Sequence, residues 1–302
     1  MQVSTSHFYN SATSLMQQLS QHADTLNTQI ATGKKLAAPS DDVVAYQRLT
    51  TIRQADADDA SYTSNISLSK SLLQQSDTTL GTIDAQMQRA AELAAQANNG
   101  TLNASDRKAI AVELRGIRDQ IVDLANTTDA RGQPLFAAAS GDSAITQAAD
   151  GTISFSGTGT PAAIPIGDGV VVQPTESAER VFGEVPASGG GTTDAFAALN
   201  GLIAALDSND LAGISRTGDD VQASLKQVGT VRSSLGARAT RVDIEESRTK
   251  DAATAREIDR TALEDTDIAA AITDLQRTMT ILQATQASFT KLSSLSLFNY
   301  LK

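Results

Sequence analysis

Few residues of this chain have the type and spacing that a chemical site requires. The run from Gly157 to Ala162, Gly-Thr-Gly-Thr-Pro-Ala, comes nearest to a glycine-rich phosphate loop. Its proline and the lack of a following apolar helix favour a β-turn instead. Asp56, Asp58 and Asp59 lack the glycine and the closing glutamate of a calcium loop, so we expect a solvated helix face there. We predict no catalytic, cofactor-binding or metal-binding residues.

Cysteine and histidine usage narrows the chemistry further. The chain has no cysteine, which excludes disulfides, thiolate nucleophiles and cysteine-bound zinc. Its two histidines, His7 and His22, are not at metal-ligand spacing. His22 falls within an apolar repeat, where we expect a packed polar interruption and not a ligand. The sequence therefore predicts a protein that is not an enzyme.

The charge balance excludes two classes of partner. In 302 residues, 35 acidic side chains outnumber 24 basic ones, and the formal net charge is −11. A nucleic acid or an anionic membrane surface is bound through basic side chains, so neither is an expected partner. The sequence has no apolar run long enough to cross a bilayer, and its start lacks the features of a Sec-type signal peptide. We expect no membrane insertion.

Apolar residues at alternating steps of three and four dominate both ends of the chain and predict long helices. The first begins near Phe8 and ends at Gly33, where Lys34 and Lys35 would complement the helix dipole. Because the pattern is that of a coiled-coil seam, this helix is expected to pack against another along its whole length.

The next helices are delimited by capping residues. Ser40 is the expected N-cap of a helix that reaches 98–100, with Gly81 as a candidate kink. A further helix is predicted from Ser105 or Asp106 to Asn126.

Composition changes between residues 141 and 191, which contain ten of the 20 glycines and four of the six prolines. Short β-rich runs at 152–155 and 170–172 predict a small insert with tight turns. Helices are expected to resume at Thr193 or Asp194, to continue from near Thr217, and to end with the seam at 268–295.

The predicted fold is therefore mainly α: a long coiled coil or helical bundle formed by the N- and C-terminal halves, with a small β-rich inserted domain. We predict a terminal coiled-coil domain from 1–40 and 261–302, a helical bundle from 41–140 and 192–260, and a β-rich surface insert at 141–191.

The two terminal seams are predicted to be an assembly interface. Pairing the ends antiparallel would place Phe8 near 289–295 and Leu26 near 268–272. The seams carry too few large apolar side chains to order the helices alone, so we expect them mobile in the free chain and completed by neighbouring copies. The predicted interface residues are Phe8, Leu15, Leu19, Leu26, Ile268, Ile272, Leu275, Met279, Leu282, Phe289, Leu295 and Leu297.

Several short motifs in both halves resemble the flagellin family. The first is Ala-Thr-Gly-Lys-Lys-Leu at 31–36 followed by Pro-Ser-Asp-Asp at 39–42, a form more typical of a junction member of the family than of the filament subunit. Others follow at 106–136, at 235–238 and at 294–301. The residues that carry the resemblance are Gly33, Pro39, Ser40, Asp41, Asp42, Arg107, Asn126, Phe136, Leu235, Gly236, Arg238, Phe298, Asn299 and Tyr300.

The resemblance implies a structural role in the bacterial flagellum. A junction member would form a ring at the end of the hook, contact a neighbouring hook-associated junction protein, and support the polymerisation of flagellin. It would be exported unfolded by the flagellar type III system, with a cytoplasmic chaperone on its C-terminal helix, and would reside outside the cell. Two alternatives stay open at this point: filament flagellin itself, and a secreted coiled-coil effector that uses the β-rich insert as a binding module.

Overall fold

The computed structural model describes residues 2–137, 143–148, 152–156 and 159–300, without the side chains of residues 2–6, 8 and 292–300. The chain forms two compact units, Met1–Ala57 with Ala252–Lys302, and Asp58–Asp251. We call them the terminal unit and the central unit. The predicted division into three parts stays a prediction.

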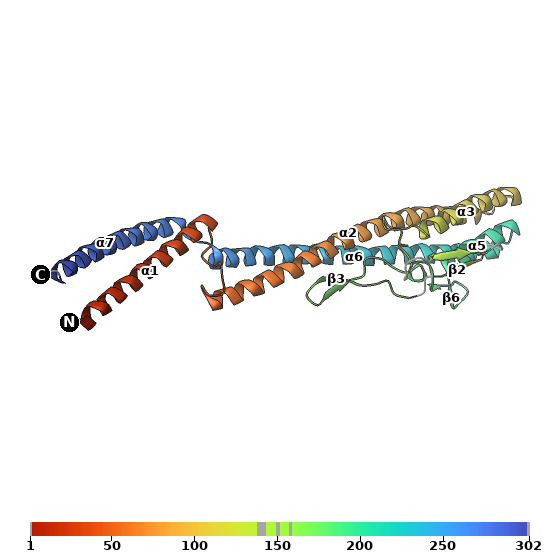
Figure 1. Ribbon diagram of the computed structural model, residues 1–302. Coiled ribbons are helices and arrows are strands. Elements are labelled where there is room, and N and C mark those ends of the chain that lie inside the picture. The colour runs from red at the N-terminus through yellow and green to blue at the C-terminus, as the bar shows by residue number, and fades with distance from the viewer. Residues whose placement is uncertain (1, 138–142, 149–151, 157–158, 301–302) are drawn as a thin grey trace. The chain divides into compact units, whose positions relative to one another are not determined.

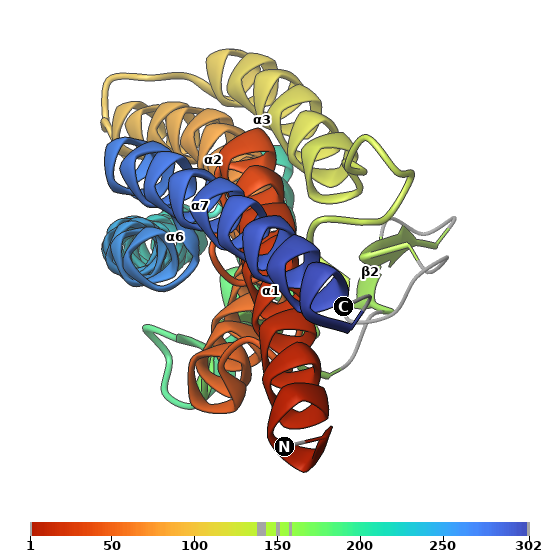
Figure 2. The same ribbon diagram turned by 60° about the vertical axis from the view of Figure 1, so that its left-hand side comes forward.

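The terminal unit contains two antiparallel helices, α1 (Gln2–Thr32) and α7 (Ile268–Tyr300), which lie side by side in Figures 1 and 2. The ring of Tyr9 meets that of Phe289 edge to face at 5.3 Å, so the predicted antiparallel pairing is confirmed near this end. The side chain of Phe8 lies outside the described residues. Gly33 ends α1 as predicted, with a φ of 71° that glycine adopts without strain.

The two longest helices are α2 (Val43–Ala97) and α6 (Leu211–Glu264). The α2 helix has no break at Gly81, which lies against the guanidinium of Arg232. The α6 helix begins at Leu211, six residues before the predicted start near Thr217; Ile214 is buried like Val221, so the apolar face extends through this first turn despite Gly213.

In the central unit, α3 (Ala104–Ala125) packs against α5 (Ala195–Asp207). Asn103 and Asp106 form a capping box that starts α3 one or two residues before the predicted position. Its end at Asn126 and the Asp194 cap of α5 are as predicted. A continuous apolar core runs through these helices and includes Leu80, Ile83, Met87, Leu114, Ile121, Leu199 and Val228.

Among the described residues after α3, three small antiparallel sheets form: β1 (Ile145–Gln147) with β2 (Ile153–Phe155), β3 (Ile164–Gly167) with β4 (Val170–Val172), and β5 (Val185–Pro186) with β6 (Thr192–Thr193). A short helix, α4 (Ala178–Phe182), separates the second sheet from the third. Ile145 and Phe182 are buried, and the Phe182 ring lies 5.1 Å from that of Phe196. This segment therefore contributes side chains to the core of the central unit.

The predicted fold class is confirmed: long helices from both halves of the chain, with small strand pairs between them. Within the described residues, no helix is long and apolar enough to cross a membrane.

Candidate assembly surface

The face of α1 that packs in the terminal unit is only partly buried. Its buried and half-buried positions follow one another at steps of three and four, as do those of α7. Large apolar side chains occupy eight of the thirteen packed positions, but among these eight only Leu26 is buried and the others are half-buried, so much of their apolar area stays in water. These packed positions are Tyr9, Ala12, Met16, Leu19, Ala23, Leu26 and Ile30 on α1, and Ala271, Leu275, Thr278, Leu282, Thr285 and Phe289 on α7.

Beside the packed face of α7 runs a second stripe that stays in solvent. Ile268, Ile272 and Met279 are 48%, 41% and 42% exposed, and on α1 Leu15 is 47% exposed. We call Ile268, Ile272 and Met279 the exposed stripe, whereas Leu15 lies beside Ser288 and Phe289 of α7. Large apolar side chains gathered along one helix face indicate a surface that another protein covers.

The single predicted seam is therefore split in two. Leu275, Leu282 and Phe289 turn towards the packed face, whereas Ile268 and its neighbours on the exposed stripe do not. His22 is also exposed and is not the packed polar interruption that we expected. The side chains of Leu295 and Leu297 lie outside the described residues.

A buried carboxylate ties the end of α1 to the end of α6. The side chain of Glu264 is 2% exposed, and its Oε1 accepts from Lys34 Nζ at 2.9 Å and from Arg53 Nη2 at 3.0 Å. Its Oε2 accepts from Arg260 Nη1 at 2.9 Å. Burial works against the charged form, but the hydrogen bonds and charges of these cations outweigh it and lower the pKa of Glu264. We call these four residues the Glu264 cluster.

Backbone hydrogen bonds run beside the Glu264 cluster. The Lys35 amide donates to the Glu264 carbonyl at 2.7 Å, and the Thr266 amide donates to the Gly33 carbonyl at 2.9 Å. The Lys35 ammonium donates to the Ala262 carbonyl at 2.9 Å. Both side chains therefore bind the end of α6, and their predicted role at the α1 dipole stays a prediction.

The Pro-Ser-Asp-Asp motif shapes the turn between α1 and α2. The Asp41 carboxylate accepts from the Ala38 amide at 2.8 Å and the Ala37 amide at 2.9 Å, and these bonds lower the pKa of Asp41. Asp42 accepts from the amides of Val44 and Ala45, so Asp42 and not Ser40 is the N-cap of α2. Pro39 and Ser40 are exposed.

Arg107 and Asn126 join segments of the central unit. Arg107 is 3% exposed and donates to the carbonyls of Ala97 (3.1 Å) and Asn99 (3.0 Å) and to Asn209 Oδ1 (2.8 Å). The Asn126 amide exchanges two hydrogen bonds with the backbone of Ile145, which anchors β1.

The other residues of the central unit that carry the family resemblance also have structural positions. Phe136 and Leu235 are buried in its core, and Gly236 lies in α6. Arg238 donates to the Gln173 carbonyl at 2.9 Å and forms an ion pair with Glu176. The side chains of Phe298, Asn299 and Tyr300 lie outside the described residues.

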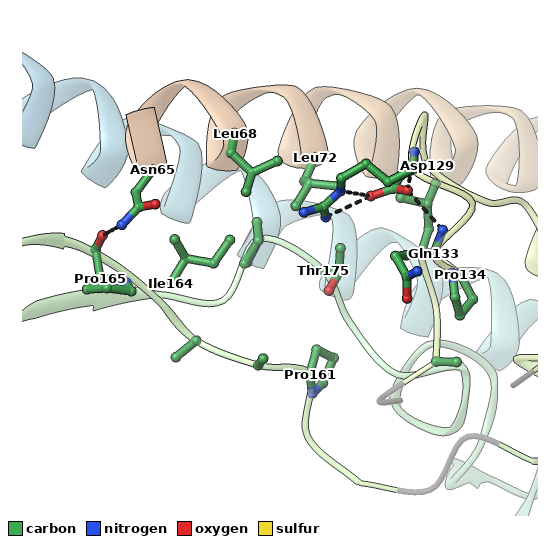
Figure 3. A pocket seen from close by; sticks show the side chains of 16 residues that line it. Asn65, Leu68, Leu72, Asp129, Gln133, Pro134, Pro161, Ile164, Pro165 and Thr175 are labelled. Atoms are coloured by element: carbon green, nitrogen blue, oxygen red, sulfur yellow. Dashed lines mark hydrogen bonds and ion pairs between the residues drawn. The ribbon is translucent and has the colours of Figure 1, made fainter. Parts of the chain in front are cut away.

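A cavity of about 530 Å³ opens beside α2 in the central unit (Figure 3). Leu68 and Leu72 point into it from α2, and the Asp129 carboxylate lies at one end. Burial opposes the charge of Asp129, but hydrogen bonds from the Gln133 amide and from Arg131 lower its pKa. Asp129 is thereby held ionised in its own turn, which does not suit a general acid at neutral pH.

The other acidic and glycine-rich candidates also take structural positions. Asp56 forms an ion pair with Arg256 at 2.8 Å while its side chain stays 44% exposed, and Asp58 is exposed. In the described part of the chain, no group of three or more acidic or histidine side chains is placed to hold a metal ion. Of the Gly157–Ala162 run, residues 157 and 158 lie outside the described residues.

Sequence reasoning missed the Glu264 cluster. Glu264 lies at the end of a polar stretch with no apolar repeat, and its three cations come from different helices and turns. The only signal available was the run of basic residues after Gly33, which the helix dipole seemed to explain.

The chain matches two sequence models, the bacterial flagellin N-terminal helical region over residues 3–140 and the bacterial flagellin C-terminal helical region over residues 219–301. Together they cover more than half of the chain. Flagellar hook-associated protein 3 of Escherichia coli K12 is 28% identical over 291 residues, which is 91% of each chain. The protein of the same name from Salmonella typhimurium LT2 is 29% identical over 306 residues, with 90% of this chain and 91% of that protein covered.

Solved structures show the same fold. The crystal structure of flagellar hook-associated protein 3 from Legionella pneumophila superposes with a TM-score of 0.66 at 16% sequence identity. The superposition covers 71% of this chain and 98% of the other.

Proposed function

This chain belongs to the flagellin family, and we propose that it is a structural subunit of the junction between the hook and the filament of the bacterial flagellum. Two relatives aligned over nine-tenths of its length are named flagellar hook-associated protein 3, which supports the junction role over that of filament subunit. The subunit is exported by the flagellar type III system and resides in the extracellular flagellum.

The exposed stripe is the observation that carries this proposal. Most of the large side chains on the packed face between α1 and α7 are only half-buried, and Ile268, Ile272 and Met279 remain largely in solvent beside it. Each is already about half-buried, so burying the remainder would contribute about 0.7–1.5 kcal/mol per residue. Neighbouring subunits supply this burial, so that the terminal helices gain most of their packing on assembly.

The assembly interface consists of the predicted seam residues of α1 and α7. Some of them pack within one subunit and the others contact neighbouring subunits. Leu19, Leu26, Leu275, Leu282 and Phe289 hold the two helices of one subunit together. The exposed stripe contacts copies of the same chain, which together form a ring. At the two rims of this ring, the subunits contact a neighbouring hook-associated junction protein and flagellin. A cytoplasmic chaperone covers the C-terminal helix before export.

A pair of double variants tests this role. Ile272→Asp with Met279→Asp places two charges on the exposed stripe. Thr273→Asp with Thr280→Asp places the same charges one residue further along, which rotates them about 100° around the helix axis to another exposed face. Each pair replaces the native chain in a motile strain, and attached filaments, flagellin released to the medium and export of the variant itself are measured.

We expect the Ile272/Met279 variant to be exported but to lose attached filaments and release flagellin, because its stripe can no longer be covered. The Thr273/Thr280 variant should keep its filaments. Normal filaments on both variants would contradict an assembly role for the exposed stripe. Equal loss on both would show that added charge alone is responsible.

A further inference from the structure

The chain contains two Asn-Gly pairs, Asn99-Gly100 and Asn200-Gly201. In such a pair the backbone nitrogen of the glycine can approach the side-chain carbonyl carbon of the asparagine, since glycine has no side chain to obstruct it. Sequence alone gives both pairs the same reactivity. In the folded chain, however, the two pairs have different surroundings.

The geometry around Asn200 prevents this approach. Asn200 lies inside α5, where the Gly201 nitrogen takes part in the helical hydrogen-bond ladder and the backbone is held in the helical conformation. The side-chain oxygen of Asn200 accepts from Arg118 Nη1 at 2.9 Å. Gly201 packs closely against Thr217, because a Cβ at Gly201 would lie 3.0 Å from the Thr217 methyl. Ring closure at Asn200 would require this turn of the helix to open.

Asn99 has the opposite surroundings. It lies between the end of α2 and the start of α3, and Asn99, Gly100 and Thr101 are all exposed. Its side-chain oxygen accepts from the Thr101 amide at 3.1 Å and from the Thr101 hydroxyl at 3.0 Å. These two bonds close a turn around Gly100 that keeps the side-chain carbonyl on the Gly100 side, and they draw electrons from its carbon. Within the described part of the chain, the Gly100 amide donates no backbone hydrogen bond that the attack would break.

We propose that Asn99 is a site of spontaneous covalent modification by deamidation. The Gly100 nitrogen forms a bond to the side-chain carbonyl carbon of Asn99 and gives up its proton. The bond from that carbon to the side-chain NH₂ breaks, and the NH₂ leaves with the proton as ammonia. One water then opens the resulting cyclic imide at either carbonyl and leaves aspartate or isoaspartate. Nothing is oxidised or reduced.

The modification alters a set of hydrogen bonds that join segments of the central unit. The Asn99 carbonyl accepts from Arg107 Nη2 at 3.0 Å and from the Leu102 amide at 3.2 Å. Isoaspartate inserts an extra carbon into the main chain at this carbonyl and adds a negative charge near the guanidinium. Arg107 also binds Ala97 and Asn209, so the change alters how the α2–α3 turn is joined to the α5–α6 turn.

The test uses the purified full-length chain, incubated at mildly alkaline pH, digested, and followed by mass spectrometry with separation of aspartate and isoaspartate peptides. The same chain unfolded in urea gives the reference rates for both asparagines. We expect the Asn99 peptide of the folded chain to convert at least about tenfold faster than the Asn200 peptide, and the two rates to approach each other in urea. Folded-state rates that are equal, or faster at Asn200, would overturn the proposal. So would an Asn99 rate far below its own rate in urea.

Two variants separate the local chemistry from the fold. Gly100→Ala should slow conversion of Asn99 because the added methyl hinders the attacking nitrogen, and it meets no atom within 4 Å. Thr101→Val removes the hydroxyl donor and should also slow it. If neither variant changes the Asn99 rate while the circular dichroism spectrum stays native, the Asn99–Thr101 turn does not direct the reaction. This result is independent of the junction role.

Discussion

Replacing Glu264 with glutamine removes the buried carboxylate that joins Lys34, Arg53 and Arg260. The variant keeps the shape of the side chain but leaves Lys34 and Arg53 without the carboxylate that they share, while Arg260 keeps its ion pair with Glu257. Removing one member of a buried ion pair destabilises a protein by about 3–5 kcal/mol. Lys34 and Arg53 are about half exposed, so solvent screens part of this loss. We therefore expect Glu264→Gln to lower the free energy of unfolding by about 2–4 kcal/mol.

The pH dependence has a defined sign. The pKa of Glu264 in the folded chain lies below its ordinary value of 4.5. The ionised carboxylate therefore stabilises the fold fully above that ordinary value, and this stability is lost as the pH falls through the folded-state pKa. The free energy of unfolding of the native chain should fall more steeply below pH 4.5 than that of Glu264→Gln.

Urea unfolding followed by circular dichroism measures both effects, because urea does not screen charges as a salt denaturant would. Glu257→Gln is the matched control: Glu257 lies on the same helix and pairs with the same Arg260, but its side chain is exposed. We expect no measurable loss of stability in this control. An equal effect of the two substitutions would refute the reasoning, since burial of Glu264 would then have no energetic consequence.

Three further outcomes are expected. Asp42→Ala should lower stability by about 0.5–2 kcal/mol through loss of the α2 cap, and Ser40→Ala should have less effect; thermal unfolding of both variants decides which residue caps the helix. Hydrogen bonds from Lys250 and Lys70 lower the pKa of Glu246 to about 2, so Lys250→Met should raise that pKa in an NMR titration, and an unchanged value would contradict the assignment. In hydrogen exchange of the free chain, the amides of α1 and α7 should be far less protected than those of α3, and strong protection without assembly would contradict the proposed role of neighbouring copies.

Local chemistry made several features of the fold predictable. Gly33 and Asn126 end helices where the sequence places them, and Asp194 begins one. Each of these signals acts within a few residues of the chain, so no knowledge of distant partners was needed. The choice between Ser40 and Asp42 as a cap failed because both side chains can accept the same bonds, and only the path of the turn selects one.

The candidate site was predictable only in outline. The repeat of three and four in α7 correctly identified an apolar face, but that face is wider than one seam. Which part of it α1 covers depends on how the two helices are rotated about their axes, and this places Leu275 against the partner and Ile272 in solvent. The periodicity of a sequence predicts which helix face is apolar, but it does not predict which residues pack against that face.

The sequence by itself determined the helical class, the position of the β-rich segment and the antiparallel pairing of the ends, because hydrophobic period, turn residues and capping are written in consecutive residues. Only the tertiary structure decided that Glu264 collects three cations, that part of the terminal seam stays exposed, and that Asn99 and Asn200 differ. These properties depend on residues far apart in the chain, or on the backbone conformation that packing imposes, and burial and charge pairing arise only when the fold brings such groups together.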